Sequence, residues 1–304
     1  MKKIFNVILF ALFCTSFAQA QLGETFEFTY KGQTLQYEVV NGNEAKVSKQ
    51  QSEGISGDVK IPERVTFAGK KYSVTTIGNY AFFECTGLTS VTIPNSVTTI
   101  GEYVFAECTG LTSIIIPNSF TTIGEAAFAE CAGLTSITIP NSVTTISEAA
   151  FWNCTGLTSI TIPNSVTTIG TSAFNGCKGL TNVTIGNSVK TIGKWAFYSC
   201  DGLSNVTIPN SVTTIGEYAF RECKGLINVT IPNSVTTIGE EAFKYCSRLT
   251  ILTIENATPP VVEGSTIEKV SENITIYVPA ESVEKYKAAE GWSEYADKIK
   301  AIGK

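Results

Sequence analysis

The sequence predicts a solenoid, a rod of stacked β-rich coils in which each coil is one 23-residue repeat. The first observation is a column of eight cysteines at a constant spacing of 23 residues, and the second is that phenylalanine and leucine columns keep the same step. Self-similarity at a fixed period of about 20–50 residues is typical of stacked repeat architectures. The three columns are Cys85, Cys108, Cys131, Cys154, Cys177, Cys200, Cys223 and Cys246; Phe82, Phe105, Phe128, Phe151, Phe174, Phe197, Phe220 and Phe243; and Leu88, Leu111, Leu134, Leu157, Leu180, Leu203, Leu226 and Leu249.

The first half of each repeat has the pattern of a strand followed by a second extended segment. In one unit, Leu88, Val91 and Ile93 have the apolar spacing of a strand whose alternate side chains face a core. Pro94 ends this strand because it has no backbone N–H for the ladder. Residues 97–100 are β-branched throughout and predict a second short extended segment.

The second half of the unit predicts a turn and a short helix. Gly101 permits the turn, and residues 102–108 predict one or two helical turns with Phe105 and Cys108 on one face. A single unit cannot bury its apolar side, whereas stacked units bury these columns in one continuous core. At ~4.8 Å per coil, the repeats form a rod about 40 Å long.

The segment before the repeats predicts a β cap, which solenoids need to cover a terminal coil. Apolar residues alternate over 26–30 and again over 35–39, and turn signals follow each run at Gly32-Gln33 and Asn41-Gly42. Ile61-Pro62 opens an incomplete first unit that an insertion at 68–71 stretches. We assign residues 21–71 to this cap and partial repeat, and residues 72–254 to the solenoid.

A second cap, with α and β elements, is predicted for residues 255–304. The repeat pattern fails after Ile254, and a strand over 274–278 and a helix over about 281–289 follow. Trp292 and Tyr295 are expected to pack over the last coil.

Residues 1–20 have the pattern of a secretory signal peptide. Lys2 and Lys3 precede an apolar run over 4–13, and Ala18-Gln19-Ala20 is a small-x-small cleavage site. Phe13 is too bulky for a lipid-attachment site at Cys14, so we expect cleavage before Gln21. No later apolar run reaches the length of a membrane span, so no membrane insertion is expected after cleavage.

Composition excludes several partners. Hydrophobic residues make up 43% of the chain and charged residues only 16%, against about 25% charged in average proteins. Removal of residues 1–20 leaves 20 basic and 27 acidic residues, a net charge of −7. This acidic balance argues against nucleic acid and anionic membrane as partners.

The cysteine column has two interpretations. Evenly spaced cysteines in an exported protein suggest disulfides, but partners in a shared ladder would have to twist out of its geometry. Buried free thiols behave as small hydrophobes, and we expect all eight to be reduced and buried. With no histidine and no close cysteine pair, neither a metal site nor another cofactor is expected.

Glutamates form two stripes that could be a glycosidase carboxylate pair or a calcium groove. The stripes recur with the repeat instead of converging on one site, which favours a structural role. We expect the first stripe to lie at helix N-termini, where acids complement the helix dipole. The stripes are Glu102, Glu125, Glu148, Glu217 and Glu240, and Glu84, Glu107, Glu130 and Glu222.

Threonines line the predicted strand face, as in ice-binding solenoids. Ile115, Asn182, Asn205, Asn228 and Ile251 interrupt that face, and threonine is a good exposed β residue in any case. Ice binding is therefore disfavoured.

Departures from the repeat mark a candidate contact surface. Aromatic and arginine side chains supply most interface hot spots, and several occupy variable positions of neighbouring units. Drift at solvent positions explains them equally well. The candidate partner-binding residues are Trp152, Lys194, Trp195, Tyr198, Tyr218 and Arg221.

Residues 72–254 resemble the BspA-type leucine-rich repeat of Bacteroidetes surface proteins, whose pattern is L-x-x-I-x-I-P-x-S-V-x-x-I-G-x-x-A-F-x-x-C. Residues 277–286 resemble the closing segment of the same family. The resemblance implies a right-handed leucine-rich-repeat solenoid of β-rich α/β class that is secreted or held at the cell surface, with the periplasm as an alternative. It also implies binding to host matrix proteins and other cells.

We therefore expect a non-catalytic, monomeric adhesion module that binds a host matrix or cell-surface protein, or a glycan. Zero histidines and the absence of a serine-nucleophile motif or phosphate loop argue against an enzyme. The alternatives are a carbohydrate-binding or carbohydrate-processing accessory protein and a passive spacer of the cell envelope.

Overall fold

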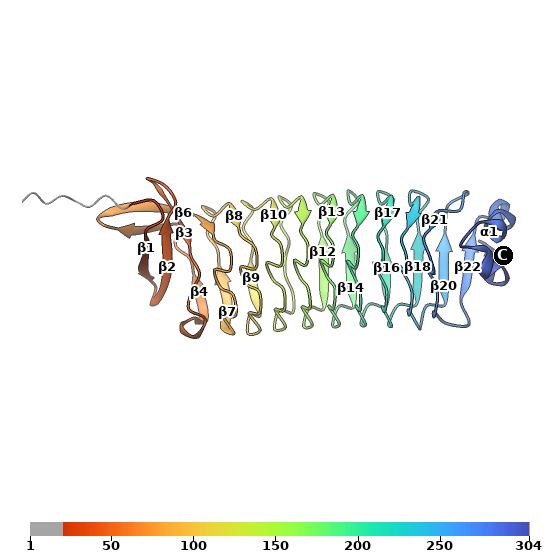
Figure 1. The fold of residues 1–304 in the computed structure, drawn as a ribbon, viewed down its shortest axis with the longest axis horizontal. Helices are drawn as coiled ribbons and strands as arrows, with labels where there is room; N and C mark the ends of the chain where they lie inside the picture. The colour runs from red at the N-terminus through yellow and green to blue at the C-terminus, as the bar shows by residue number, and fades with distance from the viewer. Residues whose placement is uncertain (1–20, 304) are drawn as a thin grey trace, which may run out of the picture.

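Successive coils of the chain lie side by side along one axis and form an elongated solenoid (Figure 1). The computed structural model describes residues 21–303, so the predicted signal peptide lies outside the described residues. Each coil has three faces, which we call the strand face, the short-strand face and the turn face. Among the described residues, no helix is both long enough and apolar enough to span a membrane.

The strand face carries one parallel strand in every coil except that of residues 136–138, which has only an isolated bridge. Equivalent residues of successive repeats pair directly, as Val183 does with Val206 and Val206 with Val229. Their side chains alternate between the core and solvent, which confirms the predicted strand. The strands are β4 (Ser56–Lys60), β7 (Gly87–Thr92), β9 (Ser113–Ile115), β12 (Ser159–Ile162), β14 (Asn182–Ile185), β16 (Asn205–Thr207), β18 (Asn228–Ile231), β20 (Ile251–Ile254), β22 (Thr275–Val278) and β23 (Ile299–Ala301).

The short-strand face confirms the second extended segment. Two-residue strands pair in parallel through the Thr-Ile dipeptide of each repeat, as Thr168 and Ile169 do with Thr191 and Ile192. These strands are β6 (Lys70–Ile77), β8 (Thr99–Ile100), β10 (Thr122–Ile123), β11 (Thr145–Ile146), β13 (Thr168–Ile169), β15 (Thr191–Ile192), β17 (Thr214–Ile215), β19 (Thr237–Ile238) and β21 (Val261–Val262).

The turn face corrects the prediction of a helix at residues 102–108. These residues form consecutive tight turns, and Tyr103 and Glu107 have left-handed backbone conformations with φ of 54° and 61°. The N–H groups of Tyr103, Phe105 and Glu107 donate to carbonyl oxygens of the next coil instead of to the preceding helical turn. Hydrogen bonding between coils thus replaces the helix.

The core is a set of ladders that run the length of the stack. Phenylalanine rings of adjacent coils lie parallel, with centroids 5.2 Å apart for Phe151 and Phe174 and 5.5 Å apart for Phe105 and Phe128. The phenylalanine, leucine and cysteine columns are all buried. The stacked dry interior expected from the repeat is therefore present.

The stack has a step, meaning a break in the pairing between adjacent coils, at Phe120. This residue stands where other repeats carry valine. On the short-strand face, Thr121 and Gly124 lack the inter-coil N–H bonds that their equivalents Thr144 and Ser147 form, and β8 does not pair with β10. On the strand face, residues 136–138 are joined to the preceding coil only by an isolated bridge. The coil around Phe120 therefore pairs with the preceding coil on the strand face and with the following coil on the short-strand face.

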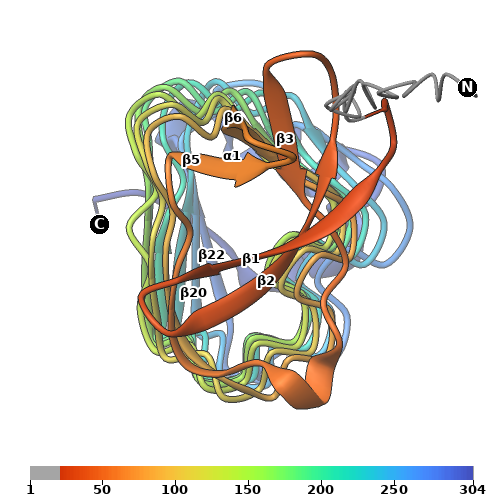
Figure 2. The same cartoon turned by 90° about the vertical axis from the view of Figure 1, so that its left-hand side faces the viewer.

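An antiparallel hairpin crosses the N-terminal end of the solenoid (Figure 2). Its two strands alternate between the core and solvent as expected, and Lys31 and Gly32, both at positive φ, make the turn. Phe26, which stacks on Phe67 with centroids 4.4 Å apart, anchors the hairpin. The elements here are β1 (Thr25–Tyr30), β2 (Gln33–Val39), β3 (Glu44–Val47), the 3₁₀ turn η1 (Ser52–Gly54) and β5 (Arg64–Phe67).

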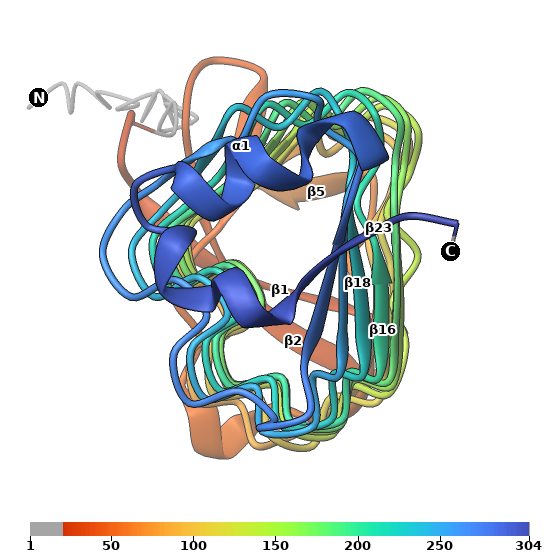
Figure 3. The ribbon, with the colours of Figure 1, turned by 90° about the vertical axis from the view of Figure 1, so that its right-hand side faces the viewer.

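Helical segments close the C-terminal end (Figure 3). The Trp292 side chain is buried, and its indole N–H donates to the Pro260 carbonyl oxygen over 3.0 Å. Tyr286 is also buried, and Tyr295 packs against the core in a half-buried position. The segments are η2 (Ala280–Ser282), α1 (Val283–Ala288) and η3 (Ser293–Lys298).

Candidate functional site

The turn face presents two outward columns of side chains, which we call column A and column B. Both arise because the tight turns point the residues five and two positions before each cysteine away from the core. Column A is Tyr80, Tyr103, Ala126, Ala149, Ser172, Trp195, Tyr218 and Glu241, and column B is Phe83, Ala106, Ala129, Trp152, Asn175, Tyr198, Arg221 and Lys244.

Trp195 and Tyr218 form an aromatic stack in column A. Their ring centroids are 5.6 Å apart and the planes differ by 18°. Lys194 Nζ lies 4.5 Å from the Trp195 centroid and 5.5 Å from the Tyr218 centroid, which places it at the rim between the rings. Lys194 also pairs with Glu217. One ring face of Trp195 is therefore covered by Tyr218.

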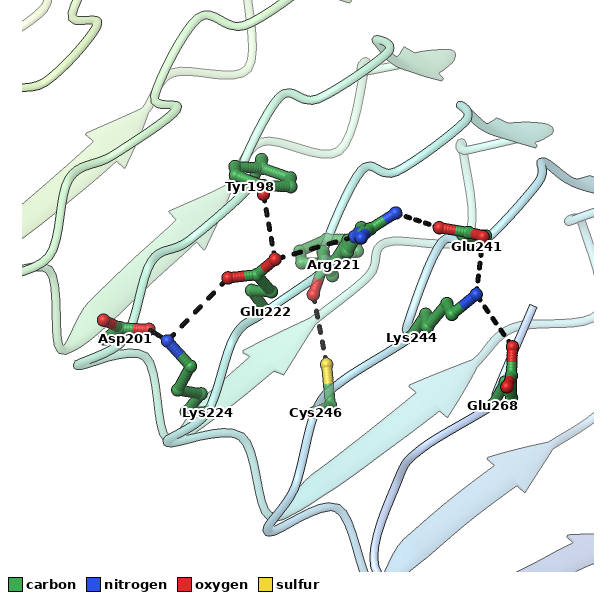
Figure 4. Close-up of polar contacts among 10 residues, drawn as sticks. Tyr198, Asp201, Arg221, Glu222, Lys224, Glu241, Lys244, Cys246 and Glu268 are labelled. Atoms are coloured by element: carbon green, nitrogen blue, oxygen red, sulfur yellow. Dashed lines mark hydrogen bonds and ion pairs between the residues drawn. The ribbon is translucent and has the colours of Figure 1, made fainter. Parts of the chain in front are cut away.

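Charges on the C-terminal coils of the turn face are paired with one another (Figure 4). Arg221 pairs with Glu241 and lies 3.7 Å from Glu222, which also accepts a 2.9 Å hydrogen bond from the Tyr198 hydroxyl and lies 3.8 Å from Lys224. Lys244 pairs with Glu241 and Glu268 at 2.7 Å each, and these carboxylates raise its pKa. The network holds these side chains in place and leaves little net charge.

Five of the six candidate residues are brought together. Lys194, Trp195 and Tyr198 belong to one coil, and Tyr218 and Arg221 belong to the next. Trp152 lies in column B two coils before Tyr198 and is 39% exposed.

Several residues of this surface were missed by sequence reasoning. Tyr245, 38% exposed, extends the aromatic surface, with the Arg221 guanidinium 5.1 Å from its ring centroid. Alignment of the repeats would have found it, because it replaces glutamate in the second stripe. Ser172 and Asn175 carry no such signal, since only the fold reveals the space above them.

A furrow runs between columns A and B across three coils. Its N-terminal end is lined by the smallest side chains, Ser172 and Asn175. Both side chains are partly exposed, and among the described residues no ring stacks on the face of Trp195 turned toward them. The furrow is lined by Ser172, Asn175, Trp195, Tyr198, Tyr218 and Arg221.

The glutamate stripes do not lie at helix N-termini, because the turn face contains no helix in the described coils. The expected dipole role is therefore wrong. Glu125 and Glu240 instead accept hydrogen bonds from the tyrosine hydroxyls of the preceding coil, Tyr103 at 3.4 Å and Tyr218 at 3.2 Å. In the second stripe, partial burial and the neighbouring Glu130 and Glu84 charges raise the pKa of Glu107.

All eight cysteines in the described part of the chain are buried and unpaired, as expected. From Cys108 onward each thiol donates to the carbonyl oxygen of the phenylalanine 26 residues earlier, in the preceding coil. Burial raises the pKa of Cys85 to about 11 and that of Cys154 to about 12. No cluster of metal-ligating side chains occurs between residues 21 and 303.

The strand face is polar and uncharged where it is hollowed. A shallow groove there is lined by hydroxyl and amide side chains of three coils, including Thr138, Thr161, Asn164 and Thr184. The threonine side chains point outward as expected. Ile115, 71% exposed, interrupts the row.

The family model described as "BspA type Leucine rich repeat region" matches residues 63–181 and 144–265, with six copies. A comparison with curated proteins finds no match.

Solved structures share the solenoid fold. A leucine-rich repeat protein from Bacteroides ovatus is 28% identical with a TM-score of 0.66, and the match covers 83% of this chain and 71% of that one. A leucine rich cell surface protein from Faecalibacterium prausnitzii is 25% identical with a TM-score of 0.53 and coverage of 92% and 95%. The T. pallidum leucine rich repeat protein is 28% identical with a TM-score of 0.56 and coverage of 63% and 87%.

Proposed function

We propose that this chain, which belongs to the family defined by the BspA type leucine rich repeat region, is a non-catalytic module that binds a protein partner outside the cytoplasm through its turn face. The partner class is a host matrix or cell-surface protein. The signal-peptide pattern of residues 1–20 supports export. The similarity to a protein described as a cell surface protein supports the same location.

The distribution of exposed aromatic rings carries this proposal. Among the described residues, the four most exposed aromatic side chains are Tyr80, Trp152, Trp195 and Tyr245, and all four lie on the turn face. Random drift at solvent positions would scatter such residues over all three faces. Exposed aromatic side chains gathered on one face are typical of interaction surfaces.

The proposal is tested by measuring attachment of residues 21–304 to immobilised matrix and cell-surface proteins. The double variant Trp195→Ala, Tyr198→Ala should weaken saturable binding by at least about 30-fold, the effect of losing a hot spot. The matched control Thr161→Ala, Thr184→Ala alters the strand face and should bind as the unmodified chain does. Equal loss in both variants, or in neither, would place the contact elsewhere or indicate a spacer.

A further inference from the structure

We propose that the N-terminal end of the furrow, over Ser172 and Asn175, binds one neutral hexopyranose unit of a glycan. The inference rests on the proposed function, because the glycan would be one carried by the protein partner that the same turn face binds. Its test is designed so that the two can fail separately.

The first argument is the open face of a two-ring stack. Column A carries Trp195 and Tyr218 on adjacent coils with centroids 5.6 Å apart, but the coil before Trp195 carries Ser172. Below this position the core continues without a gap, since Phe174 and Phe197 stack at 5.3 Å. A ligand ring placed over Ser172 would therefore stack on the open face of Trp195 at the spacing the fold already sets.

The second argument is that the neighbouring side chains make their contacts with the following coil, on the side away from this place. Tyr218 holds the far face of Trp195, and Lys194 lies at the rim between the two rings. The Tyr198 hydroxyl donates a hydrogen bond to Glu222 of the following coil, so the contact made by Tyr198 also lies on the side away from Ser172. The site is thus held open by contacts that do not involve a ligand.

The third argument concerns the chemistry of the rim. The Ser172 hydroxyl and the Asn175 amide line the furrow, are partly exposed, and can both donate and accept hydrogen bonds. A pyranose has a face of polarised C–H bonds, which the negative face of an indole attracts, and a rim of hydroxyls that donate and accept hydrogen bonds. A phenylalanine side chain from a partner would leave both polar groups unpaired.

The fourth argument is electrostatic. Lys194 is paired with Glu217 and Arg221 with Glu241, so the cations beside the site are already neutralised. A sialic or uronic acid would find no free cation among these residues. A neutral hexose or N-acetylhexosamine is the ligand that fits.

The test uses saturation-transfer NMR on residues 21–304 with four probes: the methyl glycosides of glucose, galactose and mannose, and N-acetylglucosamine. At least one probe should show transfer to its ring C–H protons, with the millimolar affinity expected of a single shallow subsite. Trp195→Ala should reduce the signal by at least fivefold. Ser172→Tyr, which places beside Trp195 the residue that stands on its other side at Tyr218, should abolish it while the stack stays folded.

Tyr30→Ala is the control, because it removes a half-exposed aromatic ring of the N-terminal hairpin, outside the furrow lining, and it should leave the signal unchanged. Absence of transfer from all four probes overturns the inference, as does transfer that survives Ser172→Tyr. Binding of N-acetylphenylalaninamide in place of the sugars also overturns it and would make the furrow a side-chain pocket. If protein attachment is lost in Trp195→Ala while no sugar binds, the proposed function stands without this site.

Discussion

The Cys177 thiol donates a 3.1 Å hydrogen bond to the Phe151 carbonyl oxygen and so links two ladders of adjacent coils. The same bond recurs down the stack between each cysteine from Cys108 onward and the phenylalanine of the preceding coil. A protonated thiol is required for the donation. Each cysteine is therefore a buried apolar residue with one weak donor, which is an arrangement that a disulfide would destroy.

Stability should fall in alkali because of these thiols. Burial raises the pKa of Cys85 to about 11 and of Cys246 to about 12, above the ordinary 9.0 that applies when the chain unfolds. Because the thiol pKa is higher in the folded chain than in the unfolded chain, the folded state loses stability as the pH rises above about 9. Below about pH 9 the stability is unaffected by these thiols. Urea unfolding at pH 8, 9 and 10 should show a progressive decrease in midpoint.

Thiol titration checks the redox state directly. The native chain 21–304 should react slowly at pH 8, and the unfolded, unreduced chain should yield close to eight free thiols. Two or fewer would mean that the cysteines are bridged.

Phe120→Val should close the step in the ladder. Valine occupies this position in the neighbouring coils, as Val97 and Val143 do. We expect the amides of Thr121 and Gly124 to gain at least about tenfold protection from hydrogen exchange, because both then bond to the preceding coil. The reverse substitution Val143→Phe should lower protection at Thr144 and Ser147. Unchanged protection in both variants would show that another residue sets the step.

Glu107→Gln should stabilise the protein slightly. Partial burial and the like charges of Glu130 and Glu84 raise the pKa of Glu107. The ionised carboxylate therefore lowers the stability of the folded state at pH values above this pKa, and the loss disappears as the pH falls and the group is protonated. We expect a gain of ~0.3 kcal/mol near pH 7 from relief of cross-strand repulsion. Glu53→Gln, at an exposed position of the N-terminal cap, should have no effect. Thermal melts at pH 7 and pH 4 measure both.

Removal of one whole coil should preserve the fold. Deletion of residues 155–177 joins Cys154 to Lys178 in register, and Phe151 should then stack on Phe197. Small-angle scattering should give an elongated particle shorter by ~5 Å. Deletion of residues 155–166 alone shifts strand positions onto turn positions and should unfold the stack. Equal tolerance of both deletions would contradict the ladder.

The coil geometry could be predicted where one residue type imposes one conformation. Proline ends most of the repeat strands, β-branched Thr-Ile pairs are extended, and an apolar column must stack because its unit cannot bury it alone. Strand, short strand and core therefore followed from the sequence.

The turn face could not be predicted from single-repeat patterns. Residues 102–108 have the composition of a helical turn, and the inter-coil hydrogen bonds that override it come from a neighbour 23 residues away. Alignment of repeats does contain one clue. Asn153 and Gly176, which tolerate a left-handed backbone, stand in the column of Glu107. The furrow could not be predicted either, because it results from two small side chains and from the stacking of Trp195 on Tyr218.

The hairpin β1–β2 and the helical layer of α1 and η3 have a consequence for assembly. Every internal coil is a template on which another coil of the same kind can add, so a bare stack would grow into a fibre by pairing end to end with its copies. Within residues 21–303, antiparallel strands cross one end, and helical segments cross the other beside the short outermost strand β23. These coverings oppose growth at both ends, so the length of the stack follows from the number of repeats encoded.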